Sequence, residues 1–307
     1  MFTGFNRNHK LLHLFLILIF LFLLPGSLNA QQVIGLSTGY SFFPSVKIDV
    51  PEEYIGGEKV QTRISTVGLA FPIAFKEGKI LILNNLGYRR VDFEWENAPE
   101  NTTASTLDRV ISINYTMFML DSLSEKWTMV AAITPGLASD FKADKVTSDD
   151  FTLQVIFGFI RKHSKNFQLG YGLAYMRDFG RPLPLPFIYF DWKKGEKLSA
   201  KGLVPVDMAL YYKLHPKLDL GLAFRISGDR HHGDPDIYSG TDNPQLEYSE
   251  GTLSPSLNIH LLPWLHLNLE GGYAPYRNFN FLDGDESAGD YDLEKTAYYR
   301  VNLILGM

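Results

Sequence analysis

Nine polar side chains that could form hydrogen bonds, ion pairs or proton-transfer chains recur in the last third of the chain, at positions of one parity within each segment. They are Asp219, Arg225, Asn258, His260, His266, Asn268, Glu270, Arg300 and Asn302. In β-strands a period of two places the members of each segment on one face. If that face points into a barrel, these side chains either line a polar channel or form a hydrogen-bonded network that fills a narrow lumen.

The histidines do not form the motif of a barrel hydrolase. A His-x-Ser pair on one strand face would place a general base beside a nucleophile, as in the lipid hydrolases of outer membranes. Here His163 is followed directly by Ser164, which points to the opposite face, and no serine lies two residues after His260 or His266. We therefore expect no esterase of this type and assign no catalytic residue.

An acidic segment near the C-terminus resembles a calcium-binding loop. Asp283, Asp285, Ser287 and Glu294 occupy positions 1, 3, 5 and 12 of that template. The required glycine at position 6 is replaced by Ala288, and no helices are expected beside the loop. The sequence therefore predicts no cofactor other than Ca²⁺ or another divalent cation at this loop.

A second group of metal-binding residue types lies between Arg230 and Asp236. It contains Arg230, His231, His232, Asp234 and Asp236. Imidazoles and carboxylates bind divalent metals, but adjacent histidines in an extended chain point to opposite faces. We therefore expect a solvated loop here.

The elements that position these residues are strands with one apolar face. At the end of the chain Ala297, Tyr299, Val301, Leu303 and Leu305 alternate with mostly polar residues. Similar alternation recurs about a dozen times, which is typical of a transmembrane antiparallel up-and-down β-barrel with lipid outside. The side chains predicted to face lipid include Leu257, Ile259, Leu267, Leu269, Val301 and Leu303.

Residues 1–30 read as a secretory signal peptide. Basic residues precede an apolar run from Leu11 to Leu24, and a small residue, Ala30, offers a cleavage site. The run is shorter than the ~20 residues that a membrane-spanning helix needs. We expect cleavage near Ala30, and residues 31–307 would then form one barrel domain.

The connections between strands alternate in length. Longer connections are expected at 44–59, 96–105, 142–150, 229–247 and 283–294, with short turns between them. Outer-membrane barrels have short periplasmic turns and long extracellular loops, with both ends of the chain in the periplasm. This rhythm favours twelve strands and an extra extracellular hairpin in the segment 179–205, with Lys193 to Lys197 at its tip.

Fourteen strands are the alternative. The stretches Phe187 to Trp192 and Leu198 to Val204 would then both belong to the wall. The prolines between Arg181 and Pro186 favour twelve, because proline cannot donate to a β-ladder.

The net charge and the cysteine content exclude some kinds of partner and modification. The net charge of −5 and the lack of a basic stripe argue against nucleic acid. With no cysteine the chain cannot carry a lipidated cysteine after the signal. The expected partners are outer-membrane lipid, lipopolysaccharide and the machinery that assembles barrels.

The mature chain resembles a known family. The alternation that ends in Tyr299, Val301, Leu303 and Leu305 is similar to the assembly signal of outer-membrane barrels, although Met307 stands where phenylalanine is usual. With the segments Leu86-Gly87-Tyr88-Arg89 and Pro184-Leu185-Pro186, it is similar to uncharacterised Gram-negative outer-membrane barrels known only as a domain of unknown function. The resemblance implies fold and location and brings no catalytic residues. A narrow passive channel for small solutes is the favoured function, and a non-conducting, partner-binding barrel is the alternative.

Overall fold

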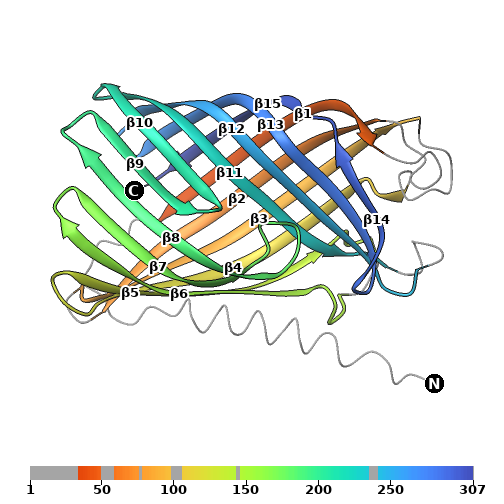
Figure 1. Cartoon of the computed structure of the whole chain (residues 1–307), viewed down its shortest axis with the longest axis horizontal. Helices are drawn as coiled ribbons and strands as arrows, with labels where there is room; N and C mark the ends of the chain where they lie inside the picture. Colours follow the sequence, from red (N-terminus) through yellow and green to blue (C-terminus); the bar gives the residue numbers. More distant parts are fainter. Residues whose placement is uncertain are drawn as a thin grey trace.

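The chain folds into a closed antiparallel β-barrel (Figure 1). The computed structural model describes residues 34–49, 59–75, 78–97, 106–142, 146–234 and 241–306. The predicted signal peptide and its cleavage site lie outside the described residues. Within these ranges, no helix is long and apolar enough to cross a membrane.

Fifteen strands are present in the described residues. They are β1 (Gly35–Asp49), β2 (Lys59–Phe75), β3 (Ile80–Glu96), β4 (Arg109–Ser122), β5 (Trp127–Ser139), β6 (Phe151–Ser164), β7 (Phe167–Met176), β8 (Leu183–Lys194), β9 (Leu198–Val204), β10 (Asp207–His215), β11 (Leu218–His232), β12 (Pro244–Leu262), β13 (Leu265–Asp283), β14 (Glu286–Leu293) and β15 (Thr296–Leu305). From β1 to β13 each strand pairs with its neighbours in sequence, and β15 closes the barrel by pairing with β13 and with β1, from Leu36↔Leu305 to Phe42↔Tyr299.

Fourteen strands form the wall, so the favoured count of twelve is wrong and the alternative is right. The fifteenth, β14, pairs with β13 and β1, the same two neighbours as β15. Both doubtful stretches are wall strands, β8 and β9, which pair with each other from Ile188↔Val204 to Lys194↔Leu198.

The prolines that argued against β8 sit where it has one neighbour. Pro184 and Pro186 pair with β7 at Tyr175 and Leu173, while the pairing of β8 with β9 starts only at Ile188. Because the other edge is unpaired there, proline removes no ladder hydrogen bond on that side.

The two ends of the barrel differ. Six short connections and both ends of the barrel domain lie at one end, which we call the terminal end, at the left of Figure 1. The opposite end, which we call the far end, carries the other connections except those from β7 to β8 and from β9 to β10, which lie part-way along the wall beside residues 226–229 of β11 (Figure 1). Lys193 to Lys197 turn the chain from β8 into β9 at the terminal end, so they join two wall strands and are not the tip of the predicted extra hairpin.

Three predicted long loops are shorter than expected, and the one expected at 44–59 includes the last residues of β1. The connection expected at 229–247 includes the last residues of β11 and the first of β12, and that at 283–294 contains β14. The strands extend because the far end is paired rather than open. At its last residue, β11 pairs in parallel with β5, His232 with Ser139.

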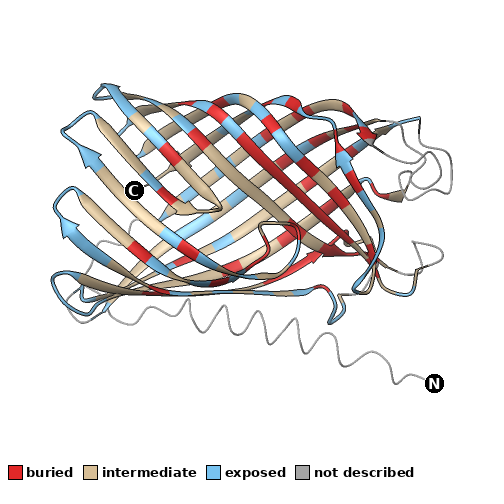
Figure 2. Ribbon diagram, in the orientation of Figure 1, coloured by how far each residue is buried: buried red, intermediate tan, exposed pale blue. Residues whose placement is uncertain are grey.

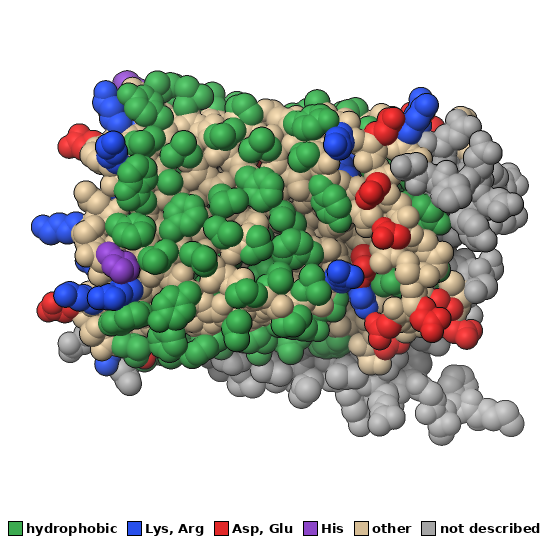
Figure 3. Space-filling model, in the orientation of Figure 1, with side chains coloured by type: hydrophobic (Ala, Val, Ile, Leu, Met, Phe, Trp, Pro, Cys, Tyr) green, Lys and Arg blue, Asp and Glu red, His purple; other side chains and the backbone are tan. Residues whose placement is uncertain are grey.

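The exterior of the barrel is apolar. On β6 the outward side chains Phe151, Leu153, Val155 and Phe157 are all exposed, and Figure 3 shows hydrophobic side chains covering the middle of the visible face, with charged groups mainly toward the two ends. The six residues predicted to face lipid are aligned across three strands. Ile259, Leu267 and Leu303 are partners, as are Leu257, Leu269 and Val301, on the face opposite the asparagines of the same strands.

The interior is packed toward the far end. Phe43, Tyr248 and Phe279 are fully buried in an apolar core that also includes Val60 and Val91. Figure 2 shows buried residues following β11 and β12 toward that end. The open part of the lumen therefore lies toward the terminal end.

Candidate functional site: the lumen cavity

A cavity of about 650 Å³ occupies the barrel near the terminal end, and we call it the lumen cavity. Fourteen of its fifteen lining residues are polar. They come from every wall strand except β3 to β7. The lining residues are Ser37, Thr38, Thr66, Asp191, Lys193, Ser199, Lys201, Tyr211, Asp219, Arg225, Asn258, His260, Asn268, Asn302 and Ile304. A cavity of this size can hold a small molecule.

The structure brings the nine predicted interior residues together on one side of the lumen. Six of them line the cavity: Asp219, Arg225, Asn258, His260, Asn268 and Asn302. His266 adjoins it through His260, whose Nδ1 is 2.7 Å from Nδ1 of His266. Glu270 and Arg300 lie deeper, toward the far end.

Three asparagines form a ladder across the wall. The Nδ2 of Asn302 donates to Oδ1 of Asn268 at 2.9 Å, and Nδ2 of Asn268 donates to Oδ1 of Asn258 at 2.7 Å. Gly39 ends the row, because a Cβ there would lie 2.4 Å from Oδ1 of Asn302. The ladder leaves amide groups at the cavity surface, where they can hydrogen-bond a polar solute.

A carboxylate and two imidazoles form a second chain. Oδ2 of Asp219 lies 2.9 Å from Nε2 of His260. If that nitrogen donates to the carboxylate, Nδ1 of neutral His260 accepts the proton of Nδ1 of His266. The chain can therefore hold a proton at the cavity wall, although no bond-breaking chemistry follows from it.

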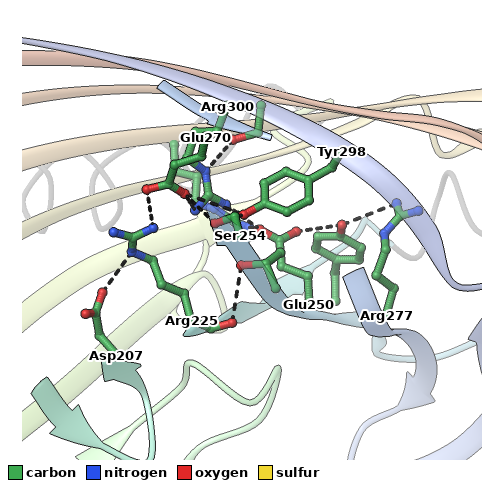
Figure 4. Close-up of polar contacts among 12 residues, drawn as sticks. Asp207, Arg225, Glu250, Ser254, Glu270, Arg277, Tyr298 and Arg300 are labelled. Carbon is green, nitrogen blue, oxygen red and sulfur yellow. Dashed lines mark hydrogen bonds and ion pairs between the residues drawn. The ribbon is translucent and has the colours of Figure 1, made fainter. Parts of the chain in front are cut away.

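An ion-pair network closes the cavity on its inner side (Figure 4). Arg225 bonds Oδ2 of Asp207 at 2.9 Å and Oε1 of Glu270 at 2.5 Å. Arg300 lies 3.5 Å from Oε2 of Glu270 and 3.6 Å from Oε1 of Glu250. Glu270 is buried, so its carboxylate loses the contact with water that stabilises a charge. The two guanidinium groups that face it compensate for this loss. The pairing also offsets the positive potential expected from Arg225 and Arg300 alone.

The network continues through residues that the sequence analysis did not select. The Oη of Tyr248 donates to Oε2 of Glu250 at 2.7 Å, and Nη2 of Arg277 donates to Oγ1 of Thr62 at 2.6 Å. Arg277 is only 1% exposed and stacks on the ring of Phe43. These side chains seal the lumen between the cavity and the far-end core.

A change of strand phase hid Arg277. On β13 the inward residues are even-numbered up to Ala274, whereas the buried Arg277 and Phe279 are odd-numbered. The three steps from Tyr273 to Tyr276 lie opposite only two steps of β12, from Leu253 to Gly251, so a β-bulge lies on β13. A fixed period of two cannot follow such a shift, so the only available signal was the single charge of Arg277 in an aromatic segment.

A buried Ser-His-Asp group lies at the far end. The Oγ of Ser112 is 2.7 Å from Oδ2 of Asp229 and 2.9 Å from Nε2 of His231. In a catalytic triad the histidine lies between the serine and the aspartate. Here the serine lies in the middle, and its hydroxyl has only one proton to donate to the two partners. Arg177 also bonds Asp229, at 2.6 Å. The group is a structural contact between β4 and β11.

The predicted loop around Arg230 to Asp236 is partly strand. Arg230, His231 and His232 belong to β11. The two histidines point apart, as predicted, since His231 contacts Ser112 and Nδ1 of His232 lies 3.0 Å from Oδ1 of Asp150. Asp236 lies outside the described residues.

The four residues of the calcium template have separate partners. Oδ1 of Asp283 accepts the backbone N–H of Asn243 at 2.8 Å, and Oδ1 of Asp285 lies 3.1 Å from Nη1 of Arg230. Ser287 donates to Asn280, while Glu294 accepts the backbone N–H of Lys47. In the part of the chain that the structure describes, no three His, Asp or Glu side chains are grouped to hold a metal. Cation binding at this loop stays a prediction.

Comparisons with known proteins concern the barrel as a whole. An outer membrane channel from Pseudomonas putida F1 is 12% identical, with 92% of this chain and 99% of that chain covered, at a TM-score of 0.43. A mutant of the TodX monoaromatic hydrocarbon channel is 10% identical, with 91% and 90% covered, at 0.40, and the NanC porin is 10% identical, with 89% and 100% covered, at 0.38. No curated protein matches the chain. The model of one family, a domain of unknown function (DUF6268), matches residues 27–305, so this chain belongs to that family, as the resemblance of its motifs predicted.

Proposed function

We propose that this chain is an outer-membrane barrel that passes small solutes through its lumen. The observation that carries the proposal is the lumen cavity of about 650 Å³, lined mostly by polar residues and placed toward the terminal end. The terminal end faces the periplasm in this proposal, because short turns and both chain ends lie on that side of bacterial barrels.

The exterior supports insertion into a membrane. Large apolar side chains such as Phe157 (49% exposed) and Leu173 (69% exposed) lie on outward faces. Contact of such a surface with water is unfavourable, whereas contact with lipid is not. Lipid, lipopolysaccharide and the assembly machinery are the partners such an insertion requires. Residues 1–30 would direct the chain across the inner membrane and be removed near Ala30. We propose no catalytic step.

A non-conducting barrel is the second candidate, and the far-end core favours it. Phe43, Tyr248 and Phe279 fill the barrel beyond the ion-pair network, so a straight path along the axis is closed in this conformation. In that case the far-end connections would be the working surface and bind a partner.

Solute flux separates the two candidates. Purified protein is incorporated into liposomes, and swelling is followed after addition of arabinose, with single-channel steps recorded in planar bilayers. Flux above protein-free liposomes supports the proposed function. No swelling and no steps would favour the binding barrel.

A further inference from the structure

The barrel wall has a break between β8 and β11. The two strands between them are short, since β9 ends at Val204 and β10 begins at Asp207. As a result, residues 183–187 of β8 pair only with β7. On the other side, residues 227–231 of β11 pair only with β12. We call these two facing edges the β8–β11 junction.

The connection from β7 to β8, residues 177–182, covers the junction. Arg177 bonds Asp229 of β11 at 2.6 Å. Gly180 lies against Gly228, where a Cβ would be 2.7 Å from the nitrogen of Gly180. Because that space admits only glycine, the connection rests directly on the backbone of β11. The break is therefore covered by a connection and not by paired strands.

Apolar side chains link the lumen cavity to the junction. Leu203 follows Lys201 of the cavity by two residues on β9, and Tyr189 precedes Asp191 of the cavity by two on β8, so each pair shares the inward face. Leu203, Tyr189 and Phe179 of the covering connection all pack against one buried cluster that contains Phe187. An apolar lining thus begins where the polar cavity ends.

The outer side of the junction is also apolar. Tyr175 on β7 and Ile188 on β8 are 41% and 52% exposed. The far end, which is the other entrance to the lumen, carries charged groups instead. Among them is Arg230, paired with Glu247 at 2.5 Å and with Asp285 at 3.1 Å. An apolar molecule would be excluded from the far end and accepted at the junction.

We propose that small apolar molecules pass between the lumen cavity and the surrounding membrane through the β8–β11 junction, with residues 177–182 as its movable cover. This inference rests on the proposed function and names its substrate class. The axial path stays closed by the far-end core, and solutes move sideways when the cover lifts. The route needs no rearrangement of the paired wall strands.

A disulfide can hold the cover down, and the chain has no cysteine of its own. A Cβ on Gly180 would lie 3.4 Å from Cβ of Ser249, close to the separation that a disulfide spans. The test variant is G180C/S249C. The φ of Gly180 is +82°, so its replacement strains the backbone, but the reduced and oxidised forms share that strain. The matched control is L210C/L222C, a partner pair on β10 and β11 away from the junction.

Uptake of N-phenyl-1-naphthylamine, an apolar fluorescent probe, is measured in cells that carry each variant in the outer membrane. We expect oxidised G180C/S249C to lower uptake to the level of cells without the protein, and reductant to restore it. The L210C/L222C control should be unaffected by oxidation. The variant F179S, which removes an apolar contact of the cover, should raise uptake above the wild type.

Uptake that is the same in oxidised and reduced G180C/S249C, with the cross-link verified, would overturn the inference. So would wild-type uptake no higher than in cells without the protein. Swelling of liposomes in arabinose distinguishes the proposed solute channel from the proposed route through the junction. Swelling without apolar uptake would retain a solute channel and reject the junction, whereas apolar uptake without swelling would retain the junction and reject a polar pore.

Discussion

Replacing Leu269 with arginine tests the assignment of the barrel's outer face. Leu269 lies on β13 between its partners Leu257 and Val301, so the new charge would have apolar neighbours on both sides. It stands four residues from Leu265, where β13 leaves the terminal end. At ~3.4 Å per residue and a tilt of about 40°, this is roughly 10 Å into an apolar band ~25 Å tall, close to the midplane.

An arginine at that depth costs about 2–4 kcal/mol of folding free energy in a membrane barrel. The matched control is N268R on the same strand. Asn268 lines the lumen cavity, so a charge there stays in contact with water, and the main loss is its two amide hydrogen bonds. Asn258 and Asn302, its two partners, also line the cavity and can bond water instead, so the loss should be about 1 kcal/mol.

The assay is reversible urea unfolding of each purified variant in lipid vesicles, followed by tryptophan fluorescence. The expected order of stability is wild type, then N268R, then L269R. Equal losses for the two variants, or a larger loss for N268R, would show that the face assignment is wrong.

Three further predictions concern orientation, selectivity and pH. A cysteine at Glu196, in the β8–β9 turn, should react with an impermeant maleimide only after the outer membrane is permeabilised, whereas one at Glu286 at the far end should react on intact cells; the reverse pattern would invert the orientation. In any conducting state, R225Q should shift the reversal potential in a salt gradient toward cations, because Asp207 and Glu270 lose the cation that they share; an unchanged potential would place the ion path elsewhere. Asp178, in the cover of the junction, has its pKa raised to about 6 by burial and by the nearby Asp229 carboxylate. Its neutral form is favoured in the closed cover, so closure should strengthen as pH falls from 7.5 to 5 and apolar uptake should drop; a D178N variant that keeps the same pH dependence would contradict this.

Strand phase was readable from the sequence wherever the wall is regular. The nine polar residues share the interior, and the six apolar ones align on the opposite face, because period-two alternation follows from the geometry of an extended backbone. The class of fold follows from the same pattern, which recurs along nearly the whole chain.

Strand number was not readable in this way. Pro184 and Pro186 argue against a wall strand because proline cannot donate to a β-ladder. Nevertheless β8 is a wall strand, and its second edge is free at those two positions. Whether an edge is paired depends on how far the next strand extends, and the sequence of β8 does not contain that information.

The sequence by itself determined which side chains face inward on regular strands, because alternation is a local property of each strand. The tertiary structure decided the rest. The β-bulge on β13 changes the phase of that strand and turns Arg277 inward beside Phe43. The pairing of His232 with Ser139 draws β11 toward β5 and closes the far end. Both contacts join segments far apart in the chain, and their energies depend on packing across the lumen, which no window of sequence can express.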